Sequence, residues 1–525
     1  MSCFNWRVLV AILPMVIGHY TFASSSDESP ESWYQDGQEE LKNSLRQIPN
    51  FRRAKNVILF LGDGMGVSTV TASRIYEGQQ RGESGEDNSL SFEKLPNLAL
   101  SKTYNTNQQT PDSAGTMSAI MTGVKTKAGV IAVNQYAQRG DCGSTIGNEL
   151  TTFLEQAEDA GLSTGVVTTT RLTHATPAAT YAHSADRDWE DDKDMPAEAL
   201  AAGCKDIASQ LIDFQHGNGL EVAMGGGRRS FLPNTVPDAE DGRVGERQDG
   251  RNLIQEWIDQ YDDSAYVWNR DQLLNINPND TDHLLGLFEN SHMQYETDRE
   301  GDVAGEPSLT EMTEKAIQVL QKNRRGYFLV VESGRIDHAH HVNNAQRALE
   351  DTKQLSAAVE SVLDKVDLKD TLVIVTADHS HVFTMAGYPK RGNPILGKVV
   401  GVDDAGNPNA DPELALDDLP YTTVGYSNGL GYAEGVGGDL RYRLPEDPGR
   451  HDMTFVDTED HDFHQEVLVP LGPETHGGED VAIYAGGPWS HLFSKTYEQN
   501  YIYHVMQHAA KLENRKQRRR PWWKR

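Results

Sequence analysis

The sequence predicts an α/β fold in which helices cover both faces of a large, mostly parallel central sheet, as a three-layer sandwich. Short apolar runs typical of buried strands recur at 57–61, 326–331, 371–376 and 481–485. Between them lie segments with helical patterns, such as 309–323, which starts with a capping box of Ser308 and Glu311, and 344–366. Because strands alternate with helices, one large α/β domain is the simplest architecture for 525 residues.

The run 326–331 is followed at once by side chains that bind metals. These are Glu332, Asp337, His338, His340 and His341. Imidazoles combined with carboxylates suit zinc, whereas a corner of carboxylates alone suits a hard ion such as magnesium. The segment indicates a site for more than one ion at a strand end. For this segment taken alone, a histidine-rich turn in solvent is the alternative.

The other strand-like runs are bordered by similar residues. Asp378 and His379 follow 371–376, Asp63 follows 57–61 between two glycines, and His476 precedes 481–485. Parallel α/β sheets collect ligands at the carboxyl ends of their strands, so distant segments meet in one crevice. We therefore expect these side chains to form a single site.

Ser113 is the candidate nucleophile. It opens an apparent helix whose apolar body includes Ala119, Ile120 and Met121. A serine at a helix start is most often only a cap, but the free N–H groups and the dipole there also bind phosphate. A zinc ion beside Ser113 would lower the pKa of its hydroxyl and remove the need for a histidine base. The two roles are compatible.

Six motifs, in order along the chain, resemble those of the alkaline phosphatase family. They are GDGM at Asp63, PDSAGT at Ser113, THATPA at His174, VESGRIDHAHH at Glu332, TADHSHVF at Asp378 and THGGEDVA at His476. The resemblance extends from about residue 55 to about residue 509. It implies metal-dependent hydrolysis of phosphate monoesters through a phosphoserine at Ser113.

The resemblance also implies which residues hold the ions. It assigns a first zinc to Asp337, His341 and His476, a second zinc to Asp63, Asp378 and His379, and a magnesium to Asp63, Thr176 and Glu332. Asp337 and His341 are four residues apart, so a short helical turn would direct both side chains to the same side.

Three further residues take roles from the resemblance. Arg187 matches the arginine that grips phosphate, and a guanidinium can donate two parallel hydrogen bonds to phosphoryl oxygens. Histidines at the positions of His174 and His338 occur near the magnesium and phosphate in the animal-type enzymes, a subgroup that this chain resembles more than the enteric bacterial one. Packing behind the ligands is the alternative role for both.

A fourth, oxygen-only site is similar to a calcium site of the animal enzymes. Its residues would be Glu240, Phe288, Glu289 and Glu306. The chain departs from the family pattern in two ways: Glu306 stands where aspartate is usual, and the segment 299–307 is two residues longer. The sequence leaves calcium binding open.

We expect the chain to divide into three parts. Residues 1–23 have the pattern of a signal peptide, with Arg7 before a short apolar stretch, and predict export to the periplasm or outside the cell. The catalytic domain is expected at 24–510, with an insertion at about 387–468. The basic tail at 511–525 is expected to be disordered and offers no stable membrane anchor. In the family the insertion forms a crown at a homodimer interface, and an arm corresponding to 32–45 embraces the second subunit.

Composition gives the remaining predictions. Cys142 and Cys204 match a family disulfide, with two free buried thiols as the alternative. The net charge of −30 argues against a nucleic-acid partner and favours a marine or halophilic bacterial source, with an ordinary acidic secreted protein as the alternative.

Two other functions remain to be distinguished. A related phosphodiesterase or sulfatase would share the metals, and a catalytically silent protein would bind only metal or phosphate. Neither is favoured, because Ser113, Arg187 and every expected ligand are present.

Overall fold

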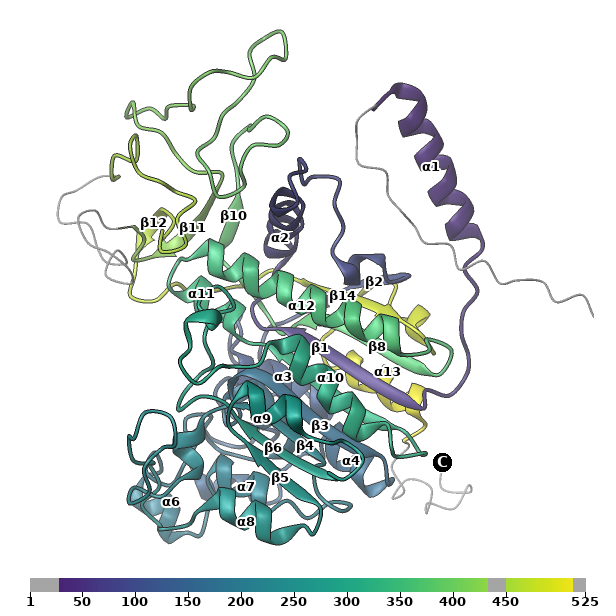
Figure 1. Cartoon of the computed structure of the whole chain (residues 1–525), viewed down its shortest axis with the longest axis vertical. Coiled ribbons are helices and arrows are strands. Elements are labelled where there is room, and N and C mark those ends of the chain that lie inside the picture. The colour runs from purple at the N-terminus through teal and green to yellow at the C-terminus, as the bar shows by residue number, and fades with distance from the viewer. Residues whose placement is uncertain (1–27, 433–449, 513–525) are drawn as a thin grey trace, which may run out of the picture. The chain divides into compact units, whose positions relative to one another are not determined.

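The computed structural model describes residues 28–432 and 450–512 (Figure 1). The predicted signal peptide and residues 513–525 of the predicted tail lie outside these ranges. Residues 1–48 and 49–525 form two separate units. No helix among the described residues has the length and apolar character needed to cross a membrane.

A ten-stranded sheet is the centre of the second unit, with the strand order β15-β2-β14-β8-β1-β7-β3-β4-β6-β5. Its strands are β1 (Asn56–Gly62), β2 (Asn97–Lys102), β3 (Ser163–Arg171), β4 (Val222–Gly226), β5 (Ser264–Val267), β6 (His283–Leu287), β7 (Tyr327–Ser333), β8 (Thr371–Ala377), β14 (Val481–Gly486) and β15 (Thr496–Glu498). The strands from β8 to β5 are parallel, and β14 is antiparallel to both β8 and β2. The predicted mostly parallel sheet is confirmed.

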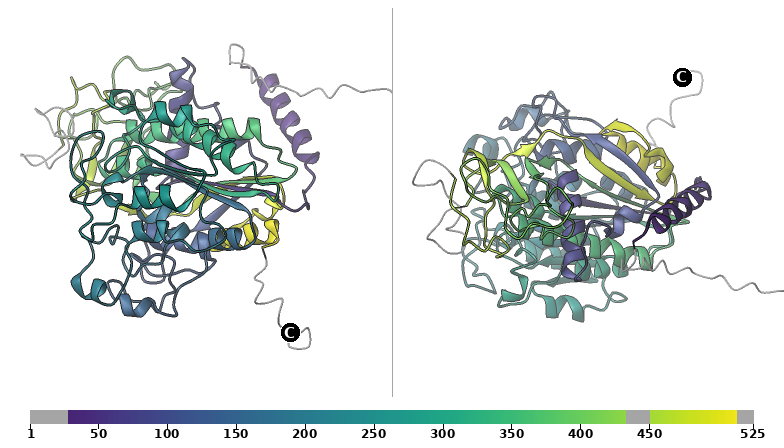
Figure 2. Two further views of the ribbon diagram at one scale, coloured as in Figure 1. Left: turned by 60° about the horizontal axis from the view of Figure 1, so that its bottom comes forward. Right: turned by 90° about the horizontal axis from the view of Figure 1, so that it is seen from above.

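Helices cover both faces of this sheet (Figures 1 and 2). One layer contains α2 (Val67–Gln80), α9 (Arg270–Asn275), α10 (Leu309–Leu320) and α12 (Ala345–Lys365). The other contains α3 (Ser113–Thr122), α4 (Phe153–Asp159), α5 (Ala175–Tyr181), α6 (Ala197–Ala201), α7 (Ile207–Ile212), α8 (Leu253–Gln260) and α13 (Tyr501–Ala510). A further short helix, α11 (Arg335–His341), follows β7.

The central strand β1 shows why two layers are needed. Successive side chains of a strand point to opposite faces, and all seven residues of β1 are buried. Val57 and Leu59 pack in one hydrophobic core, whereas Ile58 and Phe60 pack in the other. An apolar run without polar alternation is therefore the expected sequence for this position.

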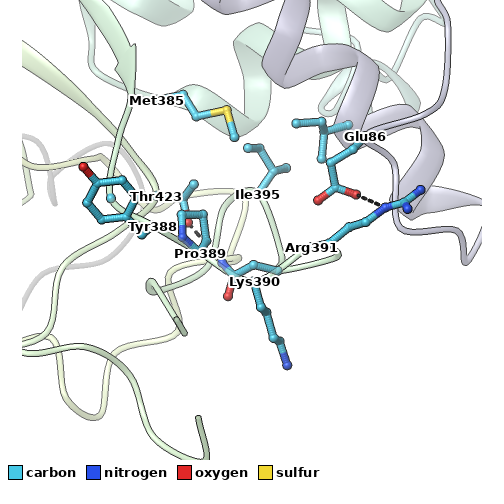
Figure 3. Close-up of a pocket in the computed structure, with 11 residues that line it drawn as sticks. Glu86, Met385, Tyr388, Pro389, Lys390, Arg391, Ile395 and Thr423 are labelled. Carbon is cyan, nitrogen blue, oxygen red and sulfur yellow. Dashed lines mark hydrogen bonds and ion pairs between the residues drawn. The ribbon is translucent and has the colours of Figure 1, made fainter. Parts of the chain in front are cut away.

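A second, small sheet is formed by strands within and at the two ends of the predicted insertion. Its strands are β10 (Phe383–Met385), β11 (Val424–Gly429) and β12 (Val467–Pro470), in the order β10-β11-β12. The start of the insertion faces α2 across a pocket of about 400 Å³ (Figure 3). At the rim of this pocket Arg391 lies 3.8 Å from Glu86.

The first unit is described through α1 (Pro30–Leu45). Ser29 caps this helix, and Pro30 occupies its first turn, where the missing N–H costs little. No residue of α1 is buried, and Trp33 and Tyr34 are exposed. The segment 32–45, which the resemblance assigns to the arm, is therefore a helix with an exposed surface.

Candidate active site

The central strands bring the predicted ligands together. β1 lies between β7 and β8, and the last residue of β1, Gly62, is paired with Ser333 and with Ala377. Asp63, α11 and Asp378 therefore start from the same edge of the sheet, as the parallel arrangement predicts.

His476 reaches this edge by a different route. It precedes β14, which runs antiparallel to β8, so the beginning of β14 meets the carboxyl end of β8. His476 and Gly477 form a short strand, β13, which pairs with β9 (Ser380–His381). His476 thus lies opposite His381.

A glycine allows the first turn of the site. Gly64 has a φ of 70°, in the left-handed region, and a Cβ there would lie 2.4 Å from the ring of His381. Only glycine tolerates both conditions.

The first cluster contains Asp337, His341 and His476. The Nε2 atoms of His341 and His476 are 3.1 Å apart and lie 3.3 and 3.4 Å from Asp337 Oδ1. Asp337 and His341 occupy successive turns of α11, as predicted. His381 also belongs here, because its Nε2 lies 2.8 Å from Asp337 Oδ1 and its Nδ1 lies 2.6 Å from Glu474 Oε2.

The second cluster contains Asp63, Asp378 and His379, all fully buried. His379 Nε2 lies 3.3 Å from Asp63 Oδ1 and 3.4 Å from Asp378 Oδ2. Burial, together with the charges of Asp378, Asp337 and Glu332, raises the pKa of Asp63 well above its usual value. Carboxylates gathered in this way need a nearby cation to remain ionised.

The third cluster shares Asp63 with Glu332, Thr176 and His174. Thr176 Oγ1 lies 3.4 Å from Asp63 Oδ2, and burial raises the pKa of Glu332 to about 7. Ligand atoms of Asp63, His174 and Glu332 lie within 4.8 Å of one another. Glu332 Oε1 and His174 Nδ1 are buried without a hydrogen-bond partner among the described residues. A bound ion would satisfy Glu332 Oε1, whereas His174 Nδ1 carries a proton because Nε2 of that ring accepts from Arg187.

Backbone carbonyls fix the three ligand imidazoles. Nδ1 lies 2.6 Å from Glu474 O in His341, 2.7 Å from Pro111 O in His476 and 3.3 Å from Ser380 O in His379. A carbonyl only accepts, so each Nδ1 carries the proton and each Nε2 presents a lone pair. Lone pairs that face one another and carboxylates at these distances fit metal ions.

Ser113 is the first residue of α3 and not its cap. Asp112 is the N-cap, and its Oδ1 accepts the N–H of Gly115 at 3.0 Å. The interpretation of Ser113 as a cap is therefore wrong, because the preceding aspartate reaches the free N–H first. Ser113 Oγ instead lies 3.1 Å from His379 Nε2, in a buried position beside the second cluster.

Arg187 lies beside the same helix start. Its NH1 donates to Asp112 Oδ2 at 3.2 Å, and its NH2 lies 3.1 Å from His174 Nε2. Asp112 thus caps α3 and holds Arg187 at once. Asp112 was not among the predicted site residues, although an aspartate before a helix is a recognisable N-cap signal.

His338 lies outside the metal clusters. Its Nδ1 is 2.9 Å from Arg335 NH1, and its ring packs against those of His174 and His292. His292 itself contacts the guanidinium of Arg171. These imidazoles form a wall behind His174, and His292 is a member that the sequence analysis missed.

The predicted oxygen-only site is regrouped. Carboxylate oxygens of Glu240, Glu289 and Asp302 lie within 4.8 Å of one another. Glu306 is buried, and its carboxylate accepts the N–H of Gln294 at 2.9 and 3.2 Å, while burial raises its pKa to about 9. Phe288 is buried at the end of β6. Asp302 is thus the carboxylate that the sequence analysis did not name.

Cys142 and Cys204 form a disulfide, as predicted, across 62 residues of sequence. Both cysteines pack with Ala185 and Trp189. These two residues flank Arg187, so the disulfide borders the segment that carries it.

Comparisons with known proteins agree with this arrangement. A model of the alkaline phosphatase family matches residues 54–512. The chain is 48% identical to the tissue-nonspecific alkaline phosphatase of Felis catus over 92% of this chain and 89% of that protein. It is 44% identical to an alkaline phosphatase of Gadus morhua over 92% of this chain and 98% of that protein.

Solved structures agree as well. The alkaline phosphatase of Thermus thermophilus, 25% identical, has a TM-score of 0.61 and is matched over 90% of this chain and 94% of that one. The enzyme of the Antarctic bacterium TAB5, 21% identical, shares the fold with a TM-score of 0.58, over 88% of this chain and 100% of that one. The chain therefore belongs to the alkaline phosphatase family and is a hydrolase of phosphate monoesters.

Proposed function

We propose that Ser113 is the nucleophile and that the reaction passes through a phosphoserine. The observation that carries this proposal is the position of Ser113 Oγ, 3.1 Å from His379 Nε2 and at the start of α3. Its hydroxyl is not used as a cap. The first N–H groups of a helix have no intrahelical acceptor, so the start of α3 can bind a phosphoryl oxygen.

We propose that the three clusters hold two zinc ions and one magnesium ion. Asp337, His341 and His476 would hold the first zinc, Asp63, Asp378 and His379 the second, and Asp63, Thr176 and Glu332 the magnesium. When bound, these ions lower the pKa of hydroxyl groups and neutralise the charge that develops on oxygen.

The residues of the chain then divide the reaction between them. Ser113 loses its hydroxyl proton to solvent, its Oγ attacks phosphorus as the bond to the ester oxygen breaks, and the alcohol leaves with a proton from solvent. Arg187, held by Asp112, donates hydrogen bonds to the equatorial phosphoryl oxygens, because its planar guanidinium can reach two oxygens at once. Water then attacks the phosphoserine, which releases inorganic phosphate and restores Ser113.

Acid quenching during turnover tests this proposal. Mass spectrometry of wild-type protein quenched with p-nitrophenyl phosphate should find phosphate on Ser113. Ser113→Ala should lose nearly all activity, about 10³-fold or more, because the residual rate would come from binding and positioning alone. A preference for the bis ester, or activity that survives in Ser113→Ala, would instead favour the phosphodiesterase alternative.

Metal analysis tests the cofactors separately. The wild-type protein should contain two zinc ions and one magnesium ion per chain, and Asp337→Asn should lose one zinc. Glu240, Glu289 and Asp302, with Glu306 behind them, are proposed as a calcium site, because oxygen ligands suit that ion. Calcium bound to wild type but not to Glu289→Gln would support it.

We also propose that the protein is exported and acts as a homodimer. The disulfide between Cys142 and Cys204 supports an oxidising compartment. The resemblance supports the dimer, with the insertion as a crown, α1 as the arm and 24–510 as the catalytic domain. Light scattering should find twice the mass of one chain, and deletion of 28–48 should weaken the dimer.

A further inference from the structure

The corner between α11 and α12 ties the metal site to the insertion. Every residue from 341 to 345 forms a hydrogen bond with the segment 461–474, which lies at the end of the insertion and just after it. His341 O accepts Glu474 N, Val342 O accepts His464 Nδ1, and Asn343 O accepts Gln465 N, at 2.9, 2.5 and 2.8 Å. Asn344 Nδ2 donates to His461 O, and Ala345 N donates to Gln465 Oε1, at 2.9 and 2.6 Å.

His340 makes a second connection, deeper in the protein. It is fully buried, with Nδ1 2.8 Å from the hydroxyl of Tyr426 in β11 and Nε2 3.0 Å from Thr69 Oγ1 in α2. Its ring lies 4.8 Å from that of His381, which contacts Asp337. Contacts therefore run without a break from β11 to a proposed zinc ligand.

Asn343 makes a third connection. Its φ of 57° is left-handed, and this conformation turns the chain from α11 into α12. Its Nδ2 donates to Asn428 O at 3.1 Å, and its Oδ1 accepts Gly431 N at 3.2 Å. Asn428 lies near the end of β11, and Gly431 lies two residues beyond it.

We propose that His340 and Asn343 are positioning residues through which strand β11 of the insertion fixes the first metal site. α11 has only seven residues, and a helix of that length does not hold its shape alone. The relative positions of Asp337 and His341 thus depend on contacts that hold the helix from outside, and β11 provides such contacts through His340 and Asn343. This inference rests on the proposed first zinc site.

The rate at which zinc leaves the holoenzyme tests the inference. Tyr426→Phe removes only the hydroxyl that meets His340 and leaves the buried ring in place. Asn343→Gly keeps the left-handed backbone accessible and removes the two side-chain bonds. With a colorimetric zinc chelator in excess, both variants should release one zinc about 10-fold faster than wild type or more, the usual effect of losing a partner behind the ligands. Release of the other zinc should change less.

A matched control and a second measurement separate this role from a structural one. Tyr421→Phe alters a second insertion tyrosine, which is only half-buried, and should release zinc at the wild-type rate. Thermal unfolding of the metal-free proteins measures the cost to the fold alone. Lower stability of metal-free Tyr426→Phe with wild-type zinc release would overturn the inference and leave the proposed metal sites intact. A wild-type protein without zinc would overturn both.

Discussion

A buried pair of carboxylates predicts how the stability of the protein depends on alkaline pH. Glu158, at the end of α4, and Glu221, just before β4, are both buried. Glu158 Oε1 accepts the hydroxyl of Thr164 at 2.6 Å, and Glu221 Oε2 accepts the N–H of the same residue at 2.7 Å. Burial and the charge of Glu221 raise the pKa of Glu158 to about 9.

The sign and the size of the effect follow from this pKa. The unfolded chain loses the Glu158 proton near its ordinary pKa of 4.5, whereas the folded protein keeps it up to about 9. The stability linked to this proton is complete below pH 4.5 and is lost as the pH rises through about 9. The free energy of unfolding should thus fall by up to about 1.4 kcal/mol per pH unit, or about 3 kcal/mol from pH 7 to 9.

Glu158→Gln should remove this dependence. The amide can still accept from Thr164, can donate to Glu221 and does not titrate. We expect denaturant unfolding at pH 7, 8 and 9 to show that the free energy of unfolding of the variant rises relative to that of wild type, by up to about 1.4 kcal/mol per pH unit. If the free energy of unfolding of the two proteins depended on pH in the same way, the reasoning that folded Glu158 keeps its proton would be refuted.

A neighbouring carboxylate on the same helix serves as the matched control. Although burial opposes it, hydrogen bonds from His183 and His216 lower the pKa of Glu155 to about 2. Its stability contribution is present above the unfolded pKa, so Glu155→Gln should destabilise the protein at pH 7. Relative to wild type, Glu158→Gln should therefore gain stability as the pH rises from 7 to 9, whereas Glu155→Gln should be less stable.

Three other changes have directions set by the structure. Asp112→Asn keeps an N-cap but removes the charge that holds Arg187, so inorganic phosphate should bind about 10-fold more weakly in inhibition assays, a loss of about 1.4 kcal/mol; unchanged inhibition would contradict the role of Asp112. Cys142→Ser should lower the free energy of unfolding by about 2–5 kcal/mol, and a reductant should destabilise wild type but not the variant. With a net charge of −30, the protein should gain stability as sodium chloride rises from low concentration; a flat melting temperature would argue against the halophile hypothesis.

The sequence could predict the sheet and most ligands because both follow local rules. Apolar runs without alternation mark strands buried on two faces, and the proposed ligands Asp63 and Asp378 directly follow such runs. That Asp337 and His341 face the same side also follows from their separation of four residues on a helix. The rule for parallel strands does not predict the position of His476. This residue reaches the same edge of the sheet because β14 is antiparallel, so that its beginning lies beside the carboxyl end of β8.

The residues that were missed depend on competition between neighbours. Asp112 and Ser113 are both good N-cap residues, and only the structure shows that α3 begins one residue after Asp112. His381 follows His379 by two residues. His381 nevertheless contacts Asp337, whereas His379 contacts Asp63 and Asp378. Residue type alone does not distribute adjacent imidazoles among clusters.

The groups that fix the ligand imidazoles carry no sequence signal at all. The carbonyls of Pro111, Ser380 and Glu474 set which ring nitrogen is free in His476, His379 and His341. Every residue has a carbonyl, so no residue type marks these positions, and a substitution does not delete the group. The tautomers are therefore controlled by the path of the backbone at these three positions, and changes that shift it should impair metal binding even where every proposed ligand side chain is kept.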